Sequence, residues 1–152
     1  MRKHKAEWIV PLAVLLLDRV SKRLTMVFLP DTDIEIWPYL HLNYVQNTGA
    51  AFGMMQGGNL IFIAVALLII GYVLKNWKEF CSYGLLAKWG LLFILSGALG
   101  NLYDRITLGF VVDFIDLRVW PVFNVADAFI TVGGVLVALS ILAGKKVSGE
   151  GK

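Results

Sequence analysis

The sequence predicts an all-α integral membrane protein with four transmembrane helices, both termini in the cytoplasm and a small extracytoplasmic β-sheet or cradle. Of its 152 residues, 58% are hydrophobic and only 16% are charged, whereas a soluble domain carries about 25% charged residues. Four apolar stretches approach the length of a spanning helix, about 20 residues. Lysine and arginine also alternate between the connections in phase with four spans. We expect residues 1–152 to form a single membrane domain.

The predicted spans cover approximately residues 8–28, 59–74, 85–104 and 123–143. The first begins like a signal peptide, with basic residues before an apolar run, but no small-residue cleavage site follows. We therefore expect this segment to be retained as the first helix.

The connections indicate how the spans are oriented. Three Lys or Arg residues precede the first span, three lie between the second span and the start of the third, and three follow the last. Segment 29–58 has none, and segment 105–122 has two. Because basic loops stay in the cytoplasm, these two are the predicted outer segments. Residues 34–37, 40–45 and 109–116 have strand-like patterns, which predicts a sheet on the outer surface.

The second half of the first span is amphipathic. A turn of about 100° per residue places Asp18, Ser21, Lys22 and Thr25 on one arc and apolar residues on the other. Ionisable groups at membrane depth are costly and are functional candidates. An Asp18–Lys22 pair that only fixes helix packing explains this arc equally well. A site-supporting role is the alternative.

A second polar group ends the third span. Gly97 and Gly100 permit close helix approach, and Asn101, Asp104 and Arg105 follow within reach of one another. A bidentate contact from Arg105 would neutralise Asp104. A capped, ion-paired helix terminus is the simpler explanation of the same residues.

Carboxylates also flank the start of the fourth span. Asp127 and Asn124 share one helix face, and the helix dipole alone would favour an acid there. Asp113 lies in an apolar stretch, where an unpartnered carboxylate would be costly. Asp116 is expected to pair with Arg118 or to face water.

The combination of Asp113 and Asp127 favours general acid–base chemistry. Two carboxyls that share a site hold one proton between them, so one activates water while the other donates a proton. We expect no metal, because the only histidines, His4 and His41, fall in different compartments. Cys81 has no histidine nearby, and no phosphate-binding motif appears, so no cofactor and no nucleic-acid partner are expected.

These segments together resemble the lipoprotein signal peptidase (signal peptidase II) family of bacteria, over about residues 8–143. The matching motifs occur in family order at residues 18–22, 47–53, 97–105, 111–116 and 123–127. One departure is the short stretch of 14 positions from Asp113 to Asp127, where many members have a longer loop.

The resemblance implies an intramembrane aspartic endopeptidase of the bacterial cytoplasmic (inner) membrane, with its active site on the extracytoplasmic side. It would remove the signal peptide of a diacylglyceryl-modified prolipoprotein before the lipidated cysteine, as a monomer among membrane lipids. The family is also the target of the antibiotic globomycin. Asp113 and Asp127 would be the catalytic dyad. The substrate-binding or supporting residues would be Asp18, Lys22, Asn47, Gly49, Asn101, Asp104, Arg105 and Asn124.

Two other classes also fit intramembrane polar groups. A small proton-coupled transporter would use carboxylates as a relay, but it needs polar groups accessible from both sides, and the inner halves of spans two to four carry none beyond Lys88. A non-enzymatic assembly subunit would use them to bind partner helices.

Overall fold

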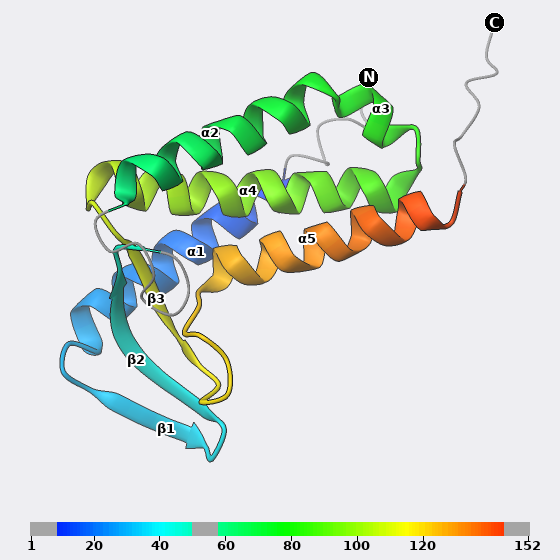
Figure 1. The fold of residues 1–152 in the computed structure, drawn as a ribbon. Helices are drawn as coiled ribbons and strands as arrows, with labels where there is room; N and C mark the ends of the chain where they lie inside the picture. Colours follow the sequence, from blue (N-terminus) through cyan, green and yellow to red (C-terminus); the bar gives the residue numbers. More distant parts are fainter. Residues whose placement is uncertain (1–8, 50–57, 145–152) are drawn as a thin grey trace, which may run out of the picture.

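The computed structural model describes residues 9–49 and 58–144, and it is mostly helical with a small sheet at one end (Figure 1). The long helices are α1 (Ile9–Phe28), α2 (Asn59–Lys75), α4 (Leu85–Thr107) and α5 (Val125–Leu142). Each lies within three residues of a predicted span, so the helix positions are confirmed. A short helix, α3 (Trp77–Cys81), which the sequence did not predict, connects α2 to α4.

Helices α4 and α5 are long and apolar enough to cross a membrane. Helix α2 is also apolar but has only 17 residues. Helix α1 has 20 residues, and its second half includes Asp18, Arg19, Lys22 and Arg23. By length and composition alone, the described helices therefore give two clear spans.

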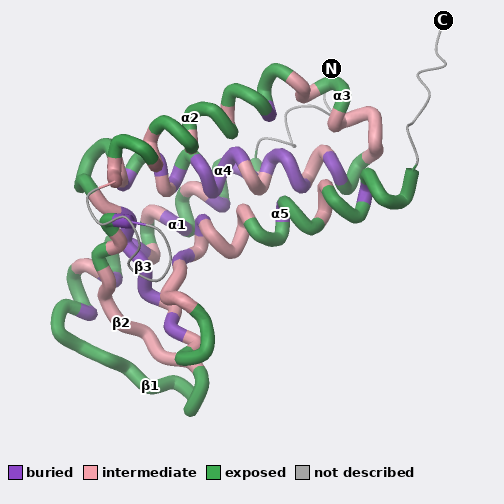
Figure 2. Tube along the Cα trace, in the orientation of Figure 1, coloured by how far each residue is buried: buried purple, intermediate pink, exposed green. Residues whose placement is uncertain are grey.

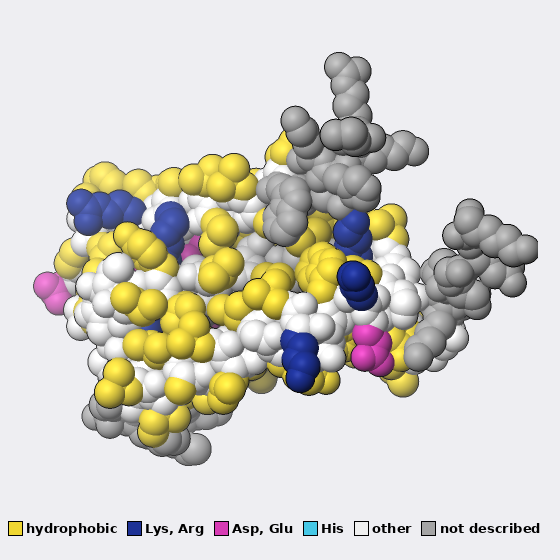
Figure 3. Space-filling view, turned by 90° about the horizontal axis from the view of Figure 1, so that it is seen from above, with side chains coloured by type: hydrophobic (Ala, Val, Ile, Leu, Met, Phe, Trp, Pro, Cys, Tyr) yellow, Lys and Arg dark blue, Asp and Glu magenta, His cyan; other side chains and the backbone are white. Residues whose placement is uncertain are grey.

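Burial is distributed in the opposite way to that of a soluble protein (Figure 2). Leu60 of α2 and Leu142 of α5 are 79% and 81% exposed, whereas Asp18 and Lys22 of α1 are each 1% exposed. Yellow apolar side chains spread over the face shown in Figure 3. An apolar exterior around buried charge is typical of a protein whose solvent is lipid.

Helix α4 packs against α1, α2 and α5. Glycines allow α4 and α5 to approach closely. A Cβ on Gly90 would lie 2.6 Å from the carbonyl oxygen of Gly133, and one on Gly97 would meet the carbonyl of Ala126. A Cβ on Gly100 would lie 2.7 Å from the Asp18 carboxylate. The predicted role of Gly97 and Gly100 in close approach is confirmed.

The sheet is antiparallel, with strand order β1 (Asp33–Trp37), β2 (Leu40–Asn47) and β3 (Val111–Asp116). These are the predicted strand segments. The pairing of β2 with β3 sets Val45 opposite Asp113 and joins the two predicted outer segments. The sheet therefore fixes Asp113 next to the end of β2, where Asn47 lies.

Candidate functional site

Asp113 and Asp127 come from different elements that meet at the sheet end of the helices. Asp113 lies on β3 and is 1% exposed. Its two carboxylate oxygens accept hydrogen bonds from the side-chain amides of Asn47, at 2.8 Å, and Asn124, at 2.7 Å. Asp127 lies in the first turn of α5. The β2–β3 pairing and the start of α5 thus position these acids together.

Asp127 also closes the N-terminus of α5. Its backbone N–H donates to the side chain of Asn124 at 2.9 Å, and its carboxylate accepts the backbone N–H of Asn124 at 3.2 Å. This reciprocal capping box explains the choice of residues here. The helix-terminal role predicted as the alternative is therefore real. The second oxygen of Asp127, however, accepts a 2.7 Å bond from Asn101 of α4.

One amide network joins the two carboxylates. The Asn124 amide that donates to Asp113 also donates to the side-chain oxygen of Asn101 at 3.2 Å, while the Asn101 side-chain amide donates to Asp127. Both asparagines thus present donors to the acids. Such an arrangement holds two carboxylates in one place without neutralising them.

The environment of Asp113 favours its protonated form. Burial first, and then the negative charge of Asp127, raise the pKa of Asp113 to about 7 from an ordinary 3.8. The amide hydrogen bonds from Asn47 and Asn124 act in the opposite direction but are outweighed. Near neutral pH, a proton is therefore available on this carboxyl.

Behind the carboxylates lies a group of four charges, the buried Asp18, Lys22 and Asp104 and the partly exposed Arg19. Lys22 contacts Asp18 at 3.0 Å and Asp104 at 2.9 Å. Arg19 contacts the same two acids at 2.7 and 2.6 Å. Two positive and two negative groups leave the cluster neutral, which is what makes its burial tolerable. The predicted Asp18–Lys22 pair is confirmed.

This ion quartet is coupled to the carboxylates and to neighbouring elements. Lys22 donates to the side-chain oxygen of Asn101 at 2.8 Å, which orients the Asn101 amide toward Asp127. Asp18 accepts the backbone N–H of Ala126 at 3.1 Å. The quartet therefore ties α1 and α4 to the first turn of α5.

Arg105 differs from its prediction. Asp104 pairs with Arg19 and Lys22 of α1, and the Arg105 guanidinium instead lies 4.6 Å from the ring centre of Phe62. The predicted Asn101–Asp104–Arg105 cluster and bidentate Asp104–Arg105 contact are therefore wrong. Successive helical residues point about 100° apart, so an Asp104 that faces α1 turns Arg105 toward α2.

Asn47 and Gly49 follow each other at the end of β2. The backbone N–H of the buried Gly49 donates to the side-chain oxygen of Asn47 at 3.0 Å. This bond leaves the Asn47 amide nitrogen directed at Asp113. Residues 50–53 of the same predicted motif lie outside the described residues.

Asp116, in contrast, belongs to a separate network that reaches the surface through Arg118. It pairs with Arg118 at 3.3 Å and accepts the Asn43 amide at 3.1 Å. Arg118 also binds Asp33, and this hydrogen bond holds the pKa of Asp33 below its usual 3.8. The predicted Asp116–Arg118 pair is confirmed.

Arg19 is the site-supporting residue that sequence reasoning missed. It does not belong to the predicted polar arc of the first span, yet it contacts both acids of the quartet and donates to the Gly100 carbonyl at 3.1 Å. Its partner Asp104 lies 85 positions away. Local spacing holds no signal for such a pair.

An apolar cavity of about 340 Å³ opens beside Asp127. Its wall combines the start of α5 with the loop that precedes it. The lining residues besides Asp127 are Leu117, Trp120, Phe123, Ala128, Thr131 and Val132. Within the described ranges, no three His, Cys, Asp or Glu side chains gather closely enough to hold a metal ion.

With this geometry in place, comparison with known proteins identifies the family. The family model of signal peptidase (SPase) II matches residues 10–143. The chain belongs to the signal peptidase II family. Among signal peptidase II relatives, the lipoprotein signal peptidase of Syntrophomonas wolfei is 48% identical over 134 residues, which are 86% of this chain and 89% of the relative. The lipoprotein signal peptidase of Halothermothrix orenii is 41% identical over 92% of this chain and 97% of its own.

Two solved structures resemble this member of the signal peptidase II family closely. Both are bacterial membrane enzymes determined by the in meso method. One, at 2.3 Å resolution, has a TM-score of 0.85 and 27% identity, and covers 97% of this chain and 94% of its own. The other, at 1.9 Å resolution, has a TM-score of 0.81 and 28% identity, with coverage of 91% and 93%.

Proposed function

We propose that the chain cleaves the signal peptide from diacylglyceryl-modified bacterial prolipoproteins, before the lipidated cysteine, as an intramembrane aspartic endopeptidase. Family membership supports the cleavage of prolipoproteins, since the relatives are lipoprotein signal peptidases. The observation that carries the catalytic type is the pair Asp113 and Asp127, joined through Asn101 and Asn124. The relatives lend no support to the transporter alternative.

In the proposed mechanism, the two carboxyls share one proton. The ionised carboxylate takes a proton from water, and the resulting nucleophile attacks the scissile carbonyl carbon. The protonated carboxyl gives its proton to the carbonyl oxygen, forming a neutral tetrahedral diol. The carboxyl that took its proton from water then protonates the amide nitrogen, while the other carboxylate removes a proton from one diol hydroxyl as the carbon–nitrogen bond breaks. The products are a carboxylic acid and a free amine, and the two carboxyls again share one proton.

The surrounding residues take supporting roles. Asn47, Asn101 and Asn124 hold the carboxylate oxygens in fixed orientations. Arg105 offers a donor for the substrate backbone, because within the described residues its buried Nη1 has no hydrogen-bond partner. Asp18, Lys22 and Asp104 act through Asn101, and Gly49 acts through Asn47.

We place the protein in the bacterial cytoplasmic membrane as one domain with four spans, α1, α2, α4 and α5. Both termini would be cytoplasmic, and the carboxylate pair would face the extracytoplasmic side. The distribution of lysine and arginine supports this orientation, although the basic residues near both ends lie outside the described residues. Four charged residues in α1 are compatible with a span because two of them, Asp18 and Lys22, are buried against α4.

A lipid-modified substrate stays in the bilayer, so the cavity beside Asp127 suits its apolar part. The cavity wall provides Trp120 and Phe123 for apolar contact, while the carboxylate at its edge is positioned to meet the scissile bond. Asp113, Asp127 and the amides that hold them all come from the same chain, and we propose that a monomer acts, surrounded by membrane lipids.

The decisive experiment is cleavage of a lipidated prolipoprotein by purified Asp113→Asn and Asp127→Asn variants. Each should lose at least about 10³-fold in rate, since neither carboxamide can exchange the proton. Membrane insertion and thermal unfolding should remain close to those of the unchanged chain.

Asp116→Asn is the matched control, because Asp116 lies on the same strand but pairs with Arg118. It should retain activity within a few-fold. Full processing by either dyad variant would refute the dyad, and an equal loss in the control would mean that the wrong acid on β3 has been assigned.

A further inference from the structure

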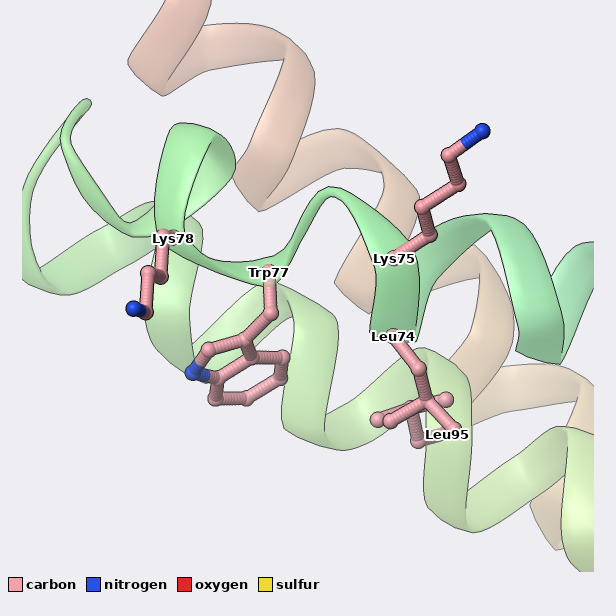
Figure 4. Close-up of a pocket in the computed structure, with 5 residues that line it drawn as sticks. All are labelled: Leu74, Lys75, Trp77, Lys78 and Leu95. Carbon is pink, nitrogen blue, oxygen red and sulfur yellow. The ribbon is translucent and has the colours of Figure 1, made fainter.

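Two cavities lie outside the proposed catalytic site, one at the end of the helices opposite the carboxylates and one that runs along α4 as far as Leu99. The first, of about 580 Å³, is lined by Leu74, Lys75, Trp77, Lys78 and Leu95 (Figure 4). The second, of about 390 Å³, lies between α1, α2 and α4 and shares Leu74 and Leu95 with the first. Leu74 and Leu95 line both, so the two cavities are neighbours, and they are here together called the inner groove.

The two parts of the inner groove differ in chemistry. In the first, the side chains of Lys75 and Lys78 extend outward in different directions, while Trp77 and Leu74 turn toward α4, where Leu95 lies (Figure 4). Basic side chains also appear at the α3 end of the face in Figure 3. Tryptophan and lysine at a helix end are typical of the membrane–water interface.

The second part is wholly apolar. Pro11, Leu12 and Leu15 line it from α1, and Ile70 lines it from α2. No charged or polar side chain contributes to its described wall. A molecule that fits both parts needs a negative group at one end and a long hydrocarbon chain at the other.

We propose that the inner groove binds an anionic phospholipid of the cytoplasmic leaflet. The negative headgroup lies at the helix end that carries the positive charges of Lys75 and Lys78, and one acyl chain runs between α1, α2 and α4. A zwitterionic lipid would fill the apolar part equally well but would gain less from the two lysines. The site rests on the proposed membrane orientation and is independent of the carboxylate pair.

The headgroup is tested by native mass spectrometry of the purified, delipidated full chain with phosphatidylglycerol or phosphatidylcholine of matched acyl chains. The unchanged chain should retain one phosphatidylglycerol in preference to phosphatidylcholine. Lys75→Gln and Lys78→Gln should each lower phosphatidylglycerol affinity about fivefold and leave phosphatidylcholine unchanged. Lys88→Gln, in the same basic connection but outside both cavities, should change affinity less than twofold.

The acyl-chain part is tested by filling it. Leu15→Trp places a ring in the groove and should weaken both lipids, whereas Leu16→Trp on the exposed side of α1 should weaken neither. Equal retention of both lipids by the unchanged chain would overturn the proposal. The proposal would also be overturned if Lys88→Gln lost as much phosphatidylglycerol affinity as Lys75→Gln and Lys78→Gln. Equal losses of lipid affinity in Leu15→Trp and Leu16→Trp would overturn it as well.

Cleavage in detergent, measured on the same preparations, separates this inference from the proposed function. Loss of the lipid preference in the lysine variants should leave cleavage unchanged. An unchanged chain that retains phosphatidylglycerol but cleaves nothing would refute the proposed function and leave the lipid site standing.

Discussion

Asp113 and Asp116 lie three positions apart on β3 but have different surroundings. Asp113 is held by two amides and opposed by the charge of Asp127. Asp116 is paired with the guanidinium of Arg118. Of these two acids, Asp113 is the one that combines deep burial with a neighbouring negative charge, which keeps a proton available near neutral pH.

This difference predicts the pH dependence of cleavage. Because the pKa of Asp113 is raised to about 7, its acid form is lost as pH rises through that value, and the initial rate should fall above it. The rate of prolipoprotein cleavage between pH 5 and pH 9 measures this. The cleavage rate of Asp116→Asn should fall over the same alkaline pH range. A rate of the unchanged chain that stays constant up to pH 9 would contradict the assignment of Asp113 as the acid.

A second residue-scale prediction concerns Lys22. Lys22→Met would leave two buried carboxylates with only Arg19 and would free the Asn101 oxygen. Removing one partner of a buried charge group costs about 3–5 kcal/mol, so thermal unfolding in detergent should shift strongly to lower temperature. Arg23→Met, at an exposed position of the same helix, should cost less than about 0.5 kcal/mol. Similar shifts for the two would count against a stabilising quartet.

Contacts within one helical turn were predictable from the sequence, and contacts between distant segments were not. The i,i+4 spacing of Asp18 and Lys22 predicted their pair, because helical geometry alone brings them together. The Arg19–Asp104 pair depends on how α1 packs against α4. The same packing turns Arg105 away from Asp104, which is why that predicted contact was wrong.

At the scale of elements, the close contact between α4 and α5 depends on glycines, which have no side chain. Gly133→Ala would bring a Cβ to 2.5 Å from the Gly90 carbonyl oxygen, so the helices would have to separate, at a cost of about 1–3 kcal/mol. Gly134→Ala is the matched control, because nothing lies within 4 Å of its Cβ position. The temperature of thermal unfolding should fall for Gly133→Ala and should stay the same or rise for Gly134→Ala. A loss of equal size in both would mean that the close approach at Gly133 is not what makes glycine necessary there.

The strands show the same limit of prediction. Period-two alternation identified β1 and β2, because alternating side chains reveal a strand without reference to its partner. It did not identify β3 as the partner of β2. That pairing sets Asn47 opposite Val111 and thereby supplies the amide that binds Asp113.

At the scale of the whole molecule, the buried charges gather at the sheet end and the basic inner groove lies at the other. Composition alone predicted the membrane class, because an excess of apolar residues can be counted without knowing how they pack. The helix positions followed from the apolar stretches. The shared network of Asn101 and Asn124 could not be predicted, since it forms only when α4, α5 and β3 meet.

The proposed orientation predicts which ends a water-soluble thiol reagent can reach in intact spheroplasts. In a Cys81→Ser background, Tyr39→Cys, at a 65% exposed position beside the β1–β2 hairpin, should react at once. Glu79→Cys, on the exposed surface of α3, should react only after the membrane is opened. Reaction of Glu79→Cys in closed spheroplasts would show that the orientation is opposite to the one proposed.

The 85 positions between Arg19 and Asp104 bear on how the protein enters the membrane during its synthesis. When α1 leaves the ribosome, its charged half has no acidic partner outside its own helix, because α4 has not yet been made. Each unmatched charge at the bilayer centre costs about 2.5–3.5 kcal/mol. Within α1, Asp18 is the one acid that can match Arg19 and Lys22, so the second negative charge of the quartet arrives only with Asp104 of α4. We therefore expect α1 to become fully stable in the membrane only when it packs against α4.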